Sequence, residues 1–228
     1  MTLSAYGLSA VSSGRTILHP TNVDIKPGER VGLVGVSGSG KSTLGHKLID
    51  NLRTNGQKVA HVPQSPDEAL DPLRSMAFHW KEAEQALGLS PDLARQQALF
   101  SALRIEGGDL KKRPWEWSRG MQQRFVIAMA LIQIPDLLVM DEPTSALDPM
   151  VAASMMDLLD RTLAASHQTA MLLITHDLGL AVRSVSRLLI IDAGHVVEDS
   201  PTEQFLVAPI TRVAQELCAH RNWLELPC

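Results

Sequence analysis

A glycine-rich segment carries the strongest chemical signal in the chain. Residues 35–42 read Gly-Val-Ser-Gly-Ser-Gly-Lys-Ser, the pattern of a glycine, four residues and Gly-Lys-Ser that marks a phosphate-binding loop. Successive backbone N–H groups of such a loop point at phosphate oxygens, and the helix that follows aims its positive end at the same anion. We therefore expect nucleotide to be bound by Gly35, Ser37, Gly38, Ser39, Gly40, Lys41, Ser42 and Thr43.

The polar side chains of this loop have expected partners. Lys41 should reach the β- and γ-phosphates, and Ser42 should bind Mg²⁺. Thr43 either hydrogen-bonds the α-phosphate or only caps the helix, and the sequence leaves both interpretations open.

Two adjacent carboxylates end an apolar run. Residues 137–142 read Leu-Leu-Val-Met-Asp-Glu, so Asp141 and Glu142 stand where a buried strand ends, at the edge of a sheet where ligands bind. Asp141 can hold Mg²⁺ through its waters, and Glu142 is placed to orient or deprotonate an attacking water. The alternative is a surface acidic turn, which the sequence Pro-Thr-Ser-Ala-Leu-Asp at 143–148 disfavours.

The elements that must position these residues alternate between strand-like and helix-like segments, which predicts an α/β fold with a largely parallel sheet. Expected strands are 30–35, 58–62, 137–140 and 171–175, followed by a hairpin of 188–192 and 195–198. Helices are expected from Lys41 to about Leu52, and from Pro149 to about Ala165 with Asp148 as N-cap.

The middle of the chain differs, because residues 66–117 hold no convincing strand. Residues 76–87 and 92–103 predict helices, the second with Ser90 as cap and Pro91 at its start. A helical block that interrupts an α/β core indicates an inserted subdomain.

Composition bounds the class of protein. The chain has 228 residues, of which 45% are hydrophobic and 20% charged, as in ordinary globular proteins. Its net charge of −4 argues against a dedicated nucleic-acid binder.

Cys218 and Cys228 cannot form a disulfide framework or a four-thiolate cluster site, and Cys228 is expected to be an idle thiol. The chain has neither an apolar stretch of roughly 18 residues nor a secretory signal, so we expect a cytoplasmic protein.

Six short motifs resemble those of the ATP-binding cassette (ABC) family of ATPases. They are 35–43 for Walker A, Gln64 for the Q-loop, 118–122 for the signature, 137–142 for Walker B, 145–148 for the D-loop and His176 for the switch histidine. One such motif is weak evidence, whereas six in the family's order are strong evidence. The resemblance covers essentially the whole chain.

The resemblance implies a fold and a domain organisation. A RecA-like P-loop core over 1–65 and 135–228 would carry an N-terminal antiparallel β-subdomain, and 66–134 would form a helical subdomain. Residues 1–228 would together make a single ABC ATPase domain.

The resemblance also implies ATP hydrolysis with Mg²⁺ in a dimer. Glu142 is then the general base, His176 contacts the γ-phosphate, and Gln64 approaches Mg²⁺ and the attacking water. The other subunit's Ser118 and Gly120 cover the γ-phosphate, and closure of the dimer drives a membrane partner. Asp148 would act across this interface while it caps its helix.

Arg119 departs from the family, in which most members have glycine at this position. Arginine adds bulk where backbone approaches phosphate, and the position could need a φ that glycine alone adopts at low cost. In one outcome, Arg119 points away or contacts phosphate itself. In the other, the half-site that this segment forms on the partner's nucleotide is weakened. The sequence favours the weakened half-site.

Adenine recognition departs as well. Family members often stack adenine on an aromatic residue upstream of the P-loop, and residues 11–13, at the matching distance, have none. Tyr6 lies further back and is expected to belong to the core of the first strand. Recognition of the base is therefore expected to be loose.

Four segments resemble the oligopeptide/dipeptide/nickel uptake branch of the family: 64–66, 70–72, 120–124 and 127–131. This implies transmembrane permease subunits, an indirect solute-binding protein, and a second ATPase subunit that is more often a different chain than a copy. The chain would sit on the inner face of the cell membrane and power uptake of peptides, nickel or metal chelates. Phe78, Trp80 and Trp115 are candidates for the groove that receives a permease helix, or are core residues.

Two other functions stand beside this one. The first is a non-transport ABC ATPase, such as an accessory subunit of phosphonate metabolism. The second is a small-molecule kinase on a P-loop fold, which is disfavoured because kinases lack the motif at 118–120 and the pair of Glu142 and His176.

Overall fold

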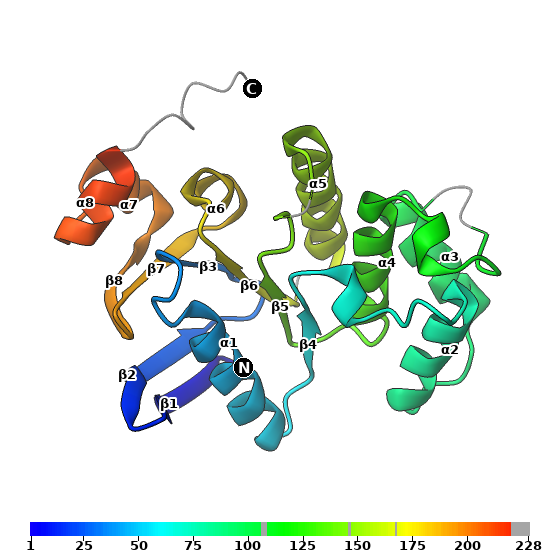
Figure 1. Ribbon diagram of the computed structural model, residues 1–228, viewed down its shortest axis with the longest axis horizontal. Helices are drawn as coiled ribbons and strands as arrows, with labels where there is room; N and C mark the ends of the chain where they lie inside the picture. Colours follow the sequence, from blue (N-terminus) through cyan, green and yellow to red (C-terminus); the bar gives the residue numbers. More distant parts are fainter. Residues whose placement is uncertain (106–108, 146, 167, 220–228) are drawn as a thin grey trace.

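A six-stranded sheet lies at the centre of the protein, whose computed structural model describes residues 1–105, 109–145, 147–166 and 168–219 (Figure 1). Its strand order is β4-β5-β6-β3-β7-β8. The strands are β3 (Arg30–Val34), β4 (Val59–Val62), β5 (Leu137–Asp141), β6 (Ala170–Thr175), β7 (Arg187–Asp192) and β8 (His195–Pro201). Strands β3 to β7 pair in parallel, and β8 returns antiparallel to β7. The expected α/β fold with a largely parallel sheet is confirmed.

Both faces of this sheet are covered. Helix α1 (Lys41–Thr54) and the antiparallel hairpin of β1 (Leu3–Ser12) and β2 (Arg15–Ile25) lie on one side, and α5 (Pro149–Ser166) and α6 (Leu178–Ser184) lie on the other (Figure 1). Alternate residues of β5 therefore enter two cores. Leu137 and Val139 pack in the core that includes α1, whereas Leu138 and Met140 pack in the core that includes α5. Burial on both faces explains why the strand is a continuous apolar run.

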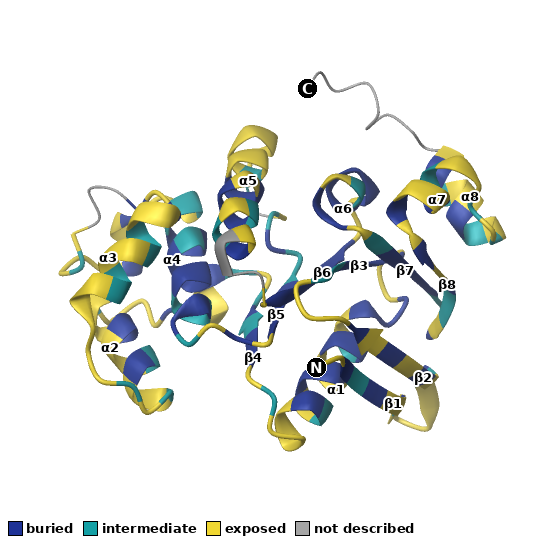
Figure 2. Ribbon diagram, turned by 180° about the vertical axis from the view of Figure 1, so that it is seen from behind, coloured by how far each residue is buried: buried dark blue, intermediate teal, exposed yellow. Residues whose placement is uncertain are grey.

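A block of helices lies beyond the β4 edge of the sheet (Figure 1). It contains α2 (Met76–Ala86), α3 (Leu93–Ala102) and α4 (Arg119–Leu131), with the 3₁₀ turns η1 (Pro66–Glu68) and η2 (Pro114–Glu116). Phe125 is fully buried at its centre, with ring centroids 5.5 Å from Trp117, 5.8 Å from Phe100 and 6.1 Å from Trp80. Figure 2 shows buried residues on α4 and mainly exposed ones on α2 and α3.

Two local expectations, the cap of α3 and the burial of Tyr6, need correction, and one alternative left open for Trp80 is decided. Asp92 rather than Ser90 caps α3, because the Arg95 backbone N–H donates to Asp92 Oδ1 at 3.0 Å. Trp80 belongs to the core of the helical block. Tyr6 lies in β1 as expected, but its side chain is 67% exposed and donates to Asp24 at 3.5 Å instead of packing in the core.

Phe78 and Trp115 differ from Trp80 in being on the surface. They are 38% and 55% exposed. The guanidinium groups of Arg74 and Arg113 lie over their rings, 4.8 and 5.0 Å from the respective centroids. These two aromatic side chains therefore remain candidates for a surface that contacts another protein.

The described chain ends with α7 (Thr202–Val207) and α8 (Arg212–Ala219). The buried Glu198 carboxylate on β8 holds this end in place, since the backbone N–H groups of Ile210 and Thr211 each donate to it at 3.0 Å. Cys218 is buried in α8, and Cys228 lies outside the described residues. Over the described ranges, the structure contains no helix with the length and apolar character needed to cross a membrane.

Candidate active site

The phosphate-loop segment runs from β3 into α1, as its sequence pattern requires. Two glycines have specific reasons to be there. A Cβ at Gly35 would collide with the backbone carbonyl of Ile191 on β7. Gly40 has φ 107° at the N-cap of α1, a conformation that L side chains rarely adopt. The backbone can therefore curl tightly enough to aim its N–H groups at one anion.

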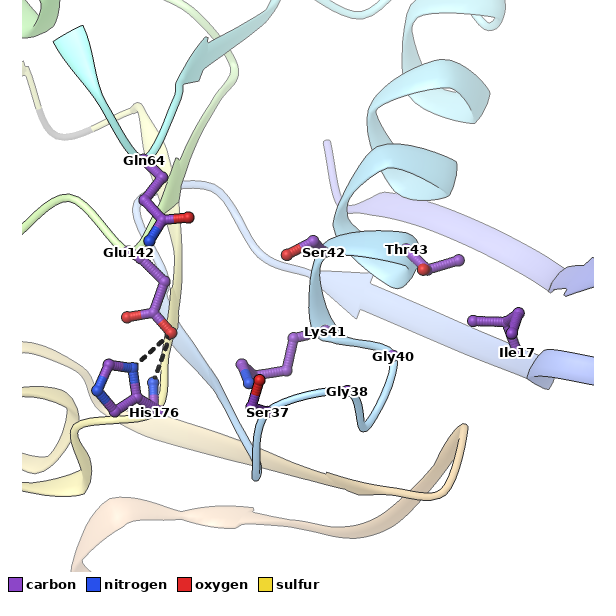
Figure 3. A pocket seen from close by; sticks show the side chains of 10 residues that line it. All are labelled: Ile17, Ser37, Gly38, Gly40, Lys41, Ser42, Thr43, Gln64, Glu142 and His176. Carbon is purple, nitrogen blue, oxygen red and sulfur yellow. Dashed lines mark hydrogen bonds and ion pairs between the residues drawn. The ribbon is translucent and has the colours of Figure 1, made fainter. Parts of the chain in front are cut away.

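A pocket of about 490 Å³ opens beside this loop (Figure 3). It brings together nine predicted residues from four separate segments: Ser37, Gly38, Gly40, Lys41, Ser42, Thr43, Gln64, Glu142 and His176. Figure 3 shows Glu142 and His176 across the pocket from Lys41. Two other predicted loop residues do not line the pocket, because Gly35 packs against β7 and Ser39 is buried beneath the loop.

Ile17 is the lining residue that sequence reasoning missed. It lies on β2, beyond Thr43 and away from Glu142 (Figure 3). The family resemblance suggests an aromatic side chain upstream of the loop, whereas this position holds an aliphatic residue of a strand. Ile17 offers an apolar surface without a hydrogen-bonding group, which suits contact with a base but not selection among bases.

Lys41 is buried at the floor of the pocket. Its Nζ donates to the carbonyl oxygens of Gly35 and Val36 at 2.8 and 3.0 Å. Burial lowers the pKa of Lys41, and the nearby carboxylates of Glu142 and Asp141 oppose that shift. The two carbonyls hold the ammonium group at the loop, and no ion pair within the described part of the chain competes for it, so it is available to a phosphate.

Glu142 and His176 line the side of the pocket opposite Lys41 (Figure 3). Glu142 Oε1 accepts a hydrogen bond from the His176 backbone N–H at 2.9 Å and lies 2.8 Å from the ring Nδ1. Thr175 Oγ1 donates to Oε2 at 3.3 Å. The backbone of Glu142 has φ 46°, a left-handed conformation that costs a non-glycine residue roughly 1–3 kcal/mol and that recurs at functional sites.

Three oxygen donors stand where Mg²⁺ was expected. Ser42 and Gln64 line the pocket, and Asp141 ends β5 half-buried, outside the lining but close enough for its charge to oppose the lowering of the Lys41 pKa. Hydroxyl, amide and carboxylate oxygens are ligands that a hard cation prefers. These residues therefore fit Mg²⁺. The Gln64 amide also donates to Ser145 Oγ at 3.5 Å, which links the residue to the segment after β5.

The remaining predicted residues lie outside the pocket. Ser118 is the N-cap of α4 and accepts from the Met121 backbone N–H at 3.3 Å, with Gly120 in the first turn. Asp148 accepts from the N–H groups of Met150 and Val151 at 3.1 and 3.0 Å, so it caps α5 as expected. Residue 146, within the predicted D-loop, lies outside the described residues.

Arg119 corrects one expectation about the signature segment. It is the first residue of α4 and is not among the residues with positive φ, so the backbone does not require glycine here. Its guanidinium forms a two-pronged ion pair with Asp67, with nitrogen–oxygen distances of 2.7 and 2.5 Å. One of the two grounds of the expectation, a backbone conformation that only glycine adopts at low cost, is therefore wrong, and the other, side-chain bulk near a partner's phosphate, stays a prediction.

Comparisons with known proteins agree with this geometry. The family model described as ABC transporter matches residues 18–145. The aliphatic sulfonates import ATP-binding protein SsuB 2 of Mesorhizobium japonicum is 40% identical over 188 residues, which cover 81% of this chain and 75% of that protein. The nickel import ATP-binding protein NikD of Pseudomonas putida is 31% identical over 240 residues, covering 94% of this chain and 93% of that protein.

Solved structures show the same fold. One, described as the ATP-binding subunit of an ABC transporter, has a TM-score of 0.75 and 24% identity, and the match covers 95% of this chain and 98% of that chain. Another, a dimeric post-hydrolysis state of an ATP-binding cassette bound to ADP and Pi, has a TM-score of 0.74 and 24% identity, covering 89% and 99%. The chain belongs to the ABC transporter family, as an ATP-hydrolysing subunit of a transporter.

Proposed function

We propose that this chain hydrolyses ATP in the Lys41 pocket to power the uptake of a small solute. The observation that carries the proposal is that the Glu142 carboxylate and the Lys41 ammonium line one pocket beside a phosphate loop. A base for water and a cation for phosphate are the two groups that hydrolysis of a phosphoanhydride needs.

The residues divide the work as follows. Backbone N–H groups of 35–40 and the start of α1 bind the phosphates, and Lys41 neutralises charge on the β- and γ-groups. Glu142 accepts a proton from the attacking water, and His176 orients Glu142 and contacts the γ-phosphate. Ser42, Gln64 and Asp141 would hold Mg²⁺, which when bound offsets the negative charge of the phosphates.

The site also needs a second ATPase subunit. Ser118 and Gly120 lie outside the pocket, so we infer that each pocket is completed by the signature segment of another subunit. Closure around ATP and reopening after hydrolysis would drive permease subunits in the membrane, with this chain on the inner face and a solute-binding protein delivering cargo. A different chain or a second copy can take the partner's place.

The class of solute is drawn from relatives. Two are named for nickel and aliphatic sulfonate import, and a third, the oligopeptide transport ATP-binding protein OppD of Salmonella typhimurium, is 32% identical over 226 residues, covering 86% of this chain and 67% of that protein. We infer uptake of peptides, nickel or metal chelates, and the sulfonate relative adds small organic anions.

Uptake in a strain that lacks this gene tests the proposal. The measurement compares accumulation of radiolabelled nickel, a short peptide and an alkanesulfonate. The parent chain should restore uptake of one solute, and the Glu142→Gln chain should not. If the strain that lacks the gene accumulates all three solutes as well as the strain that has it, the importer assignment fails. A non-transport ABC ATPase then becomes the better explanation.

A further inference from the structure

The ion pair between Arg119 and Asp67 joins two segments that matter for the proposed reaction. Asp67 lies in η1, three residues after Gln64, and Arg119 opens α4 directly after Ser118. Both guanidinium NH₂ groups are used, with Nη1 at 2.7 Å from Oδ1 and Nη2 at 2.5 Å from Oδ2. Gln122 Oε1 accepts a further hydrogen bond from Nη1 at 3.3 Å. The arginine is therefore held on η1.

The charges at this helix end are unusual. An ordinary signature segment would offer only N–H groups and a hydroxyl to a partner's phosphate, but here a carboxylate lies beside the first residue of the helix. Left unpaired, the Asp67 carboxylate would repel the triphosphate. The Arg119 guanidinium cancels that charge, and Asp67 in turn keeps a long cation from covering the N–H groups of α4.

Exposure limits how much this pair adds to folding. The side chains of Arg119 and Asp67 are 46% and 62% exposed, and exposed ion pairs add about 0–1 kcal/mol to stability. Stability alone therefore gives little reason for a two-pronged pair here. Neutralising the Asp67 charge at the end of α4 that would face a partner's phosphate is a better explanation for the pair.

We propose that Asp67 and Arg119 are a charge-compensated pair of positioning residues that keeps this signature segment competent to cover a partner's triphosphate. The inference rests on the proposed function, because it needs a second subunit's nucleotide. The proposal predicts directions of change that side-chain bulk alone does not. Removing Arg119 should weaken closure of the dimer, removing the Asp67 charge should strengthen it, and removing both should return it to the level of the parent.

The experiment measures ATP-dependent association of the Glu142→Gln chain by light scattering, with nucleotide binding followed separately by a fluorescent ATP analogue. Arg119→Gly should weaken association on the order of tenfold, because it leaves Asp67 unpaired beside phosphate. Asp67→Asn should strengthen it, and the double variant should lie within about twofold of the parent. Arg119→Lys, which keeps the charge, should stay close to the parent and guards against a folding defect in the glycine variant.

Two controls separate charge from structure. Arg212 is the first residue of α8 and pairs with Glu216 at 2.8 Å, so Arg212→Gly makes the same change at the same helix position away from the site. It should leave association unchanged. At about 1 M salt, where screening acts within about 3 Å, the differences among the Asp67 and Arg119 variants should shrink.

Each outcome decides the proposal. If Arg119→Gly associates as well as the parent or better, or if the double variant stays as weak as Arg119→Gly, the compensation is wrong. A Glu142→Gln chain that binds ATP yet stays monomeric contradicts a signature segment that is competent in a dimer of this chain, but leaves the ATPase assignment intact. A chain that binds no ATP removes the proposed function and this inference together.

Discussion

Glu142 and His176 are 34 positions apart in the chain, yet Glu142 Oε1 lies 2.9 Å from the His176 backbone nitrogen and 2.8 Å from its ring Nδ1. An ionised carboxylate only accepts hydrogen bonds, so Nδ1 must carry the proton. In a neutral ring Nε2 is then an acceptor. A hydrogen bond from Nε2 to a phosphate oxygen therefore requires a second proton on the ring.

Replacing Glu142 by Gln should trap ATP and reduce turnover at least about 100-fold, because the amide cannot accept the proton of the attacking water. Phosphate release and ATP retention on the purified chain measure the two effects. Glu203→Gln, at an exposed position of α7, should leave both unchanged. Retained turnover in Glu142→Gln would exclude Glu142 as the base.

His176→Ala should lower kcat by roughly tenfold to 100-fold while ATP binding changes little, because the chain loses the group that lies 2.8 Å from Glu142 and that we propose orients it and contacts the γ-phosphate. Steady-state kinetics and a binding titration on the same variant separate these quantities. An equal loss of binding and turnover would mean that His176 holds substrate rather than the base.

Lys41→Met should weaken ATP binding on the order of 100-fold, since it removes a buried cation from the floor of the pocket. Lys47→Met is the matched control, because Lys47 lies on the same helix but is exposed and outside this pocket. Calorimetric titration with ATP checks both variants, and similar affinities for the two would contradict the role given to Lys41.

Phe125→Ala should lower the free energy of unfolding by about 3–5 kcal/mol, because this fully buried ring packs between Trp80, Phe100 and Trp117. Leu93→Ala, at a residue that is 72% exposed, should change it by less than about 0.5 kcal/mol. Denaturant unfolding of both variants measures the difference. Equal costs would mean that the aromatic cluster does not support the helical block.

The pKa of the Asp67 carboxyl lies below its ordinary value of 3.8, because Arg119 donates hydrogen bonds to it. A lowered folded-state pKa means that the pair stabilises the fold above pH 3.8, and that this stabilisation is lost as the pH falls through the folded-state value. An NMR titration should show a higher pKa for Asp67 in Arg119→Gly. An unchanged pKa would mean that the ion pair does not form in solution.

Much of the fold follows from patterns within single segments. The apolar run at 137–140 predicts a buried strand, and the Asp-Pro pair at 148–149 predicts the start of α5, because both signals depend only on neighbouring residues. The residue that caps α3 does not follow from neighbouring residues alone. Ser90 and Asp92 are both good caps, and only the packed helix shows which side chain reaches a free N–H. Tyr6 was misassigned because strand propensity does not say which face of a hairpin is covered.

Patterns of residue types predict the local chemistry: a phosphate-binding loop, a carboxylate at the end of a buried strand, and the motifs that led to the ABC family. These depend on residue types at short separations. Only the tertiary structure decided which side chains meet, because contacts across 34 residues between Glu142 and His176, and across 52 between Asp67 and Arg119, are set by how strands and helices pack. The same packing places Ile17, which no motif predicts, in the pocket, and it pairs the Arg119 guanidinium with Asp67.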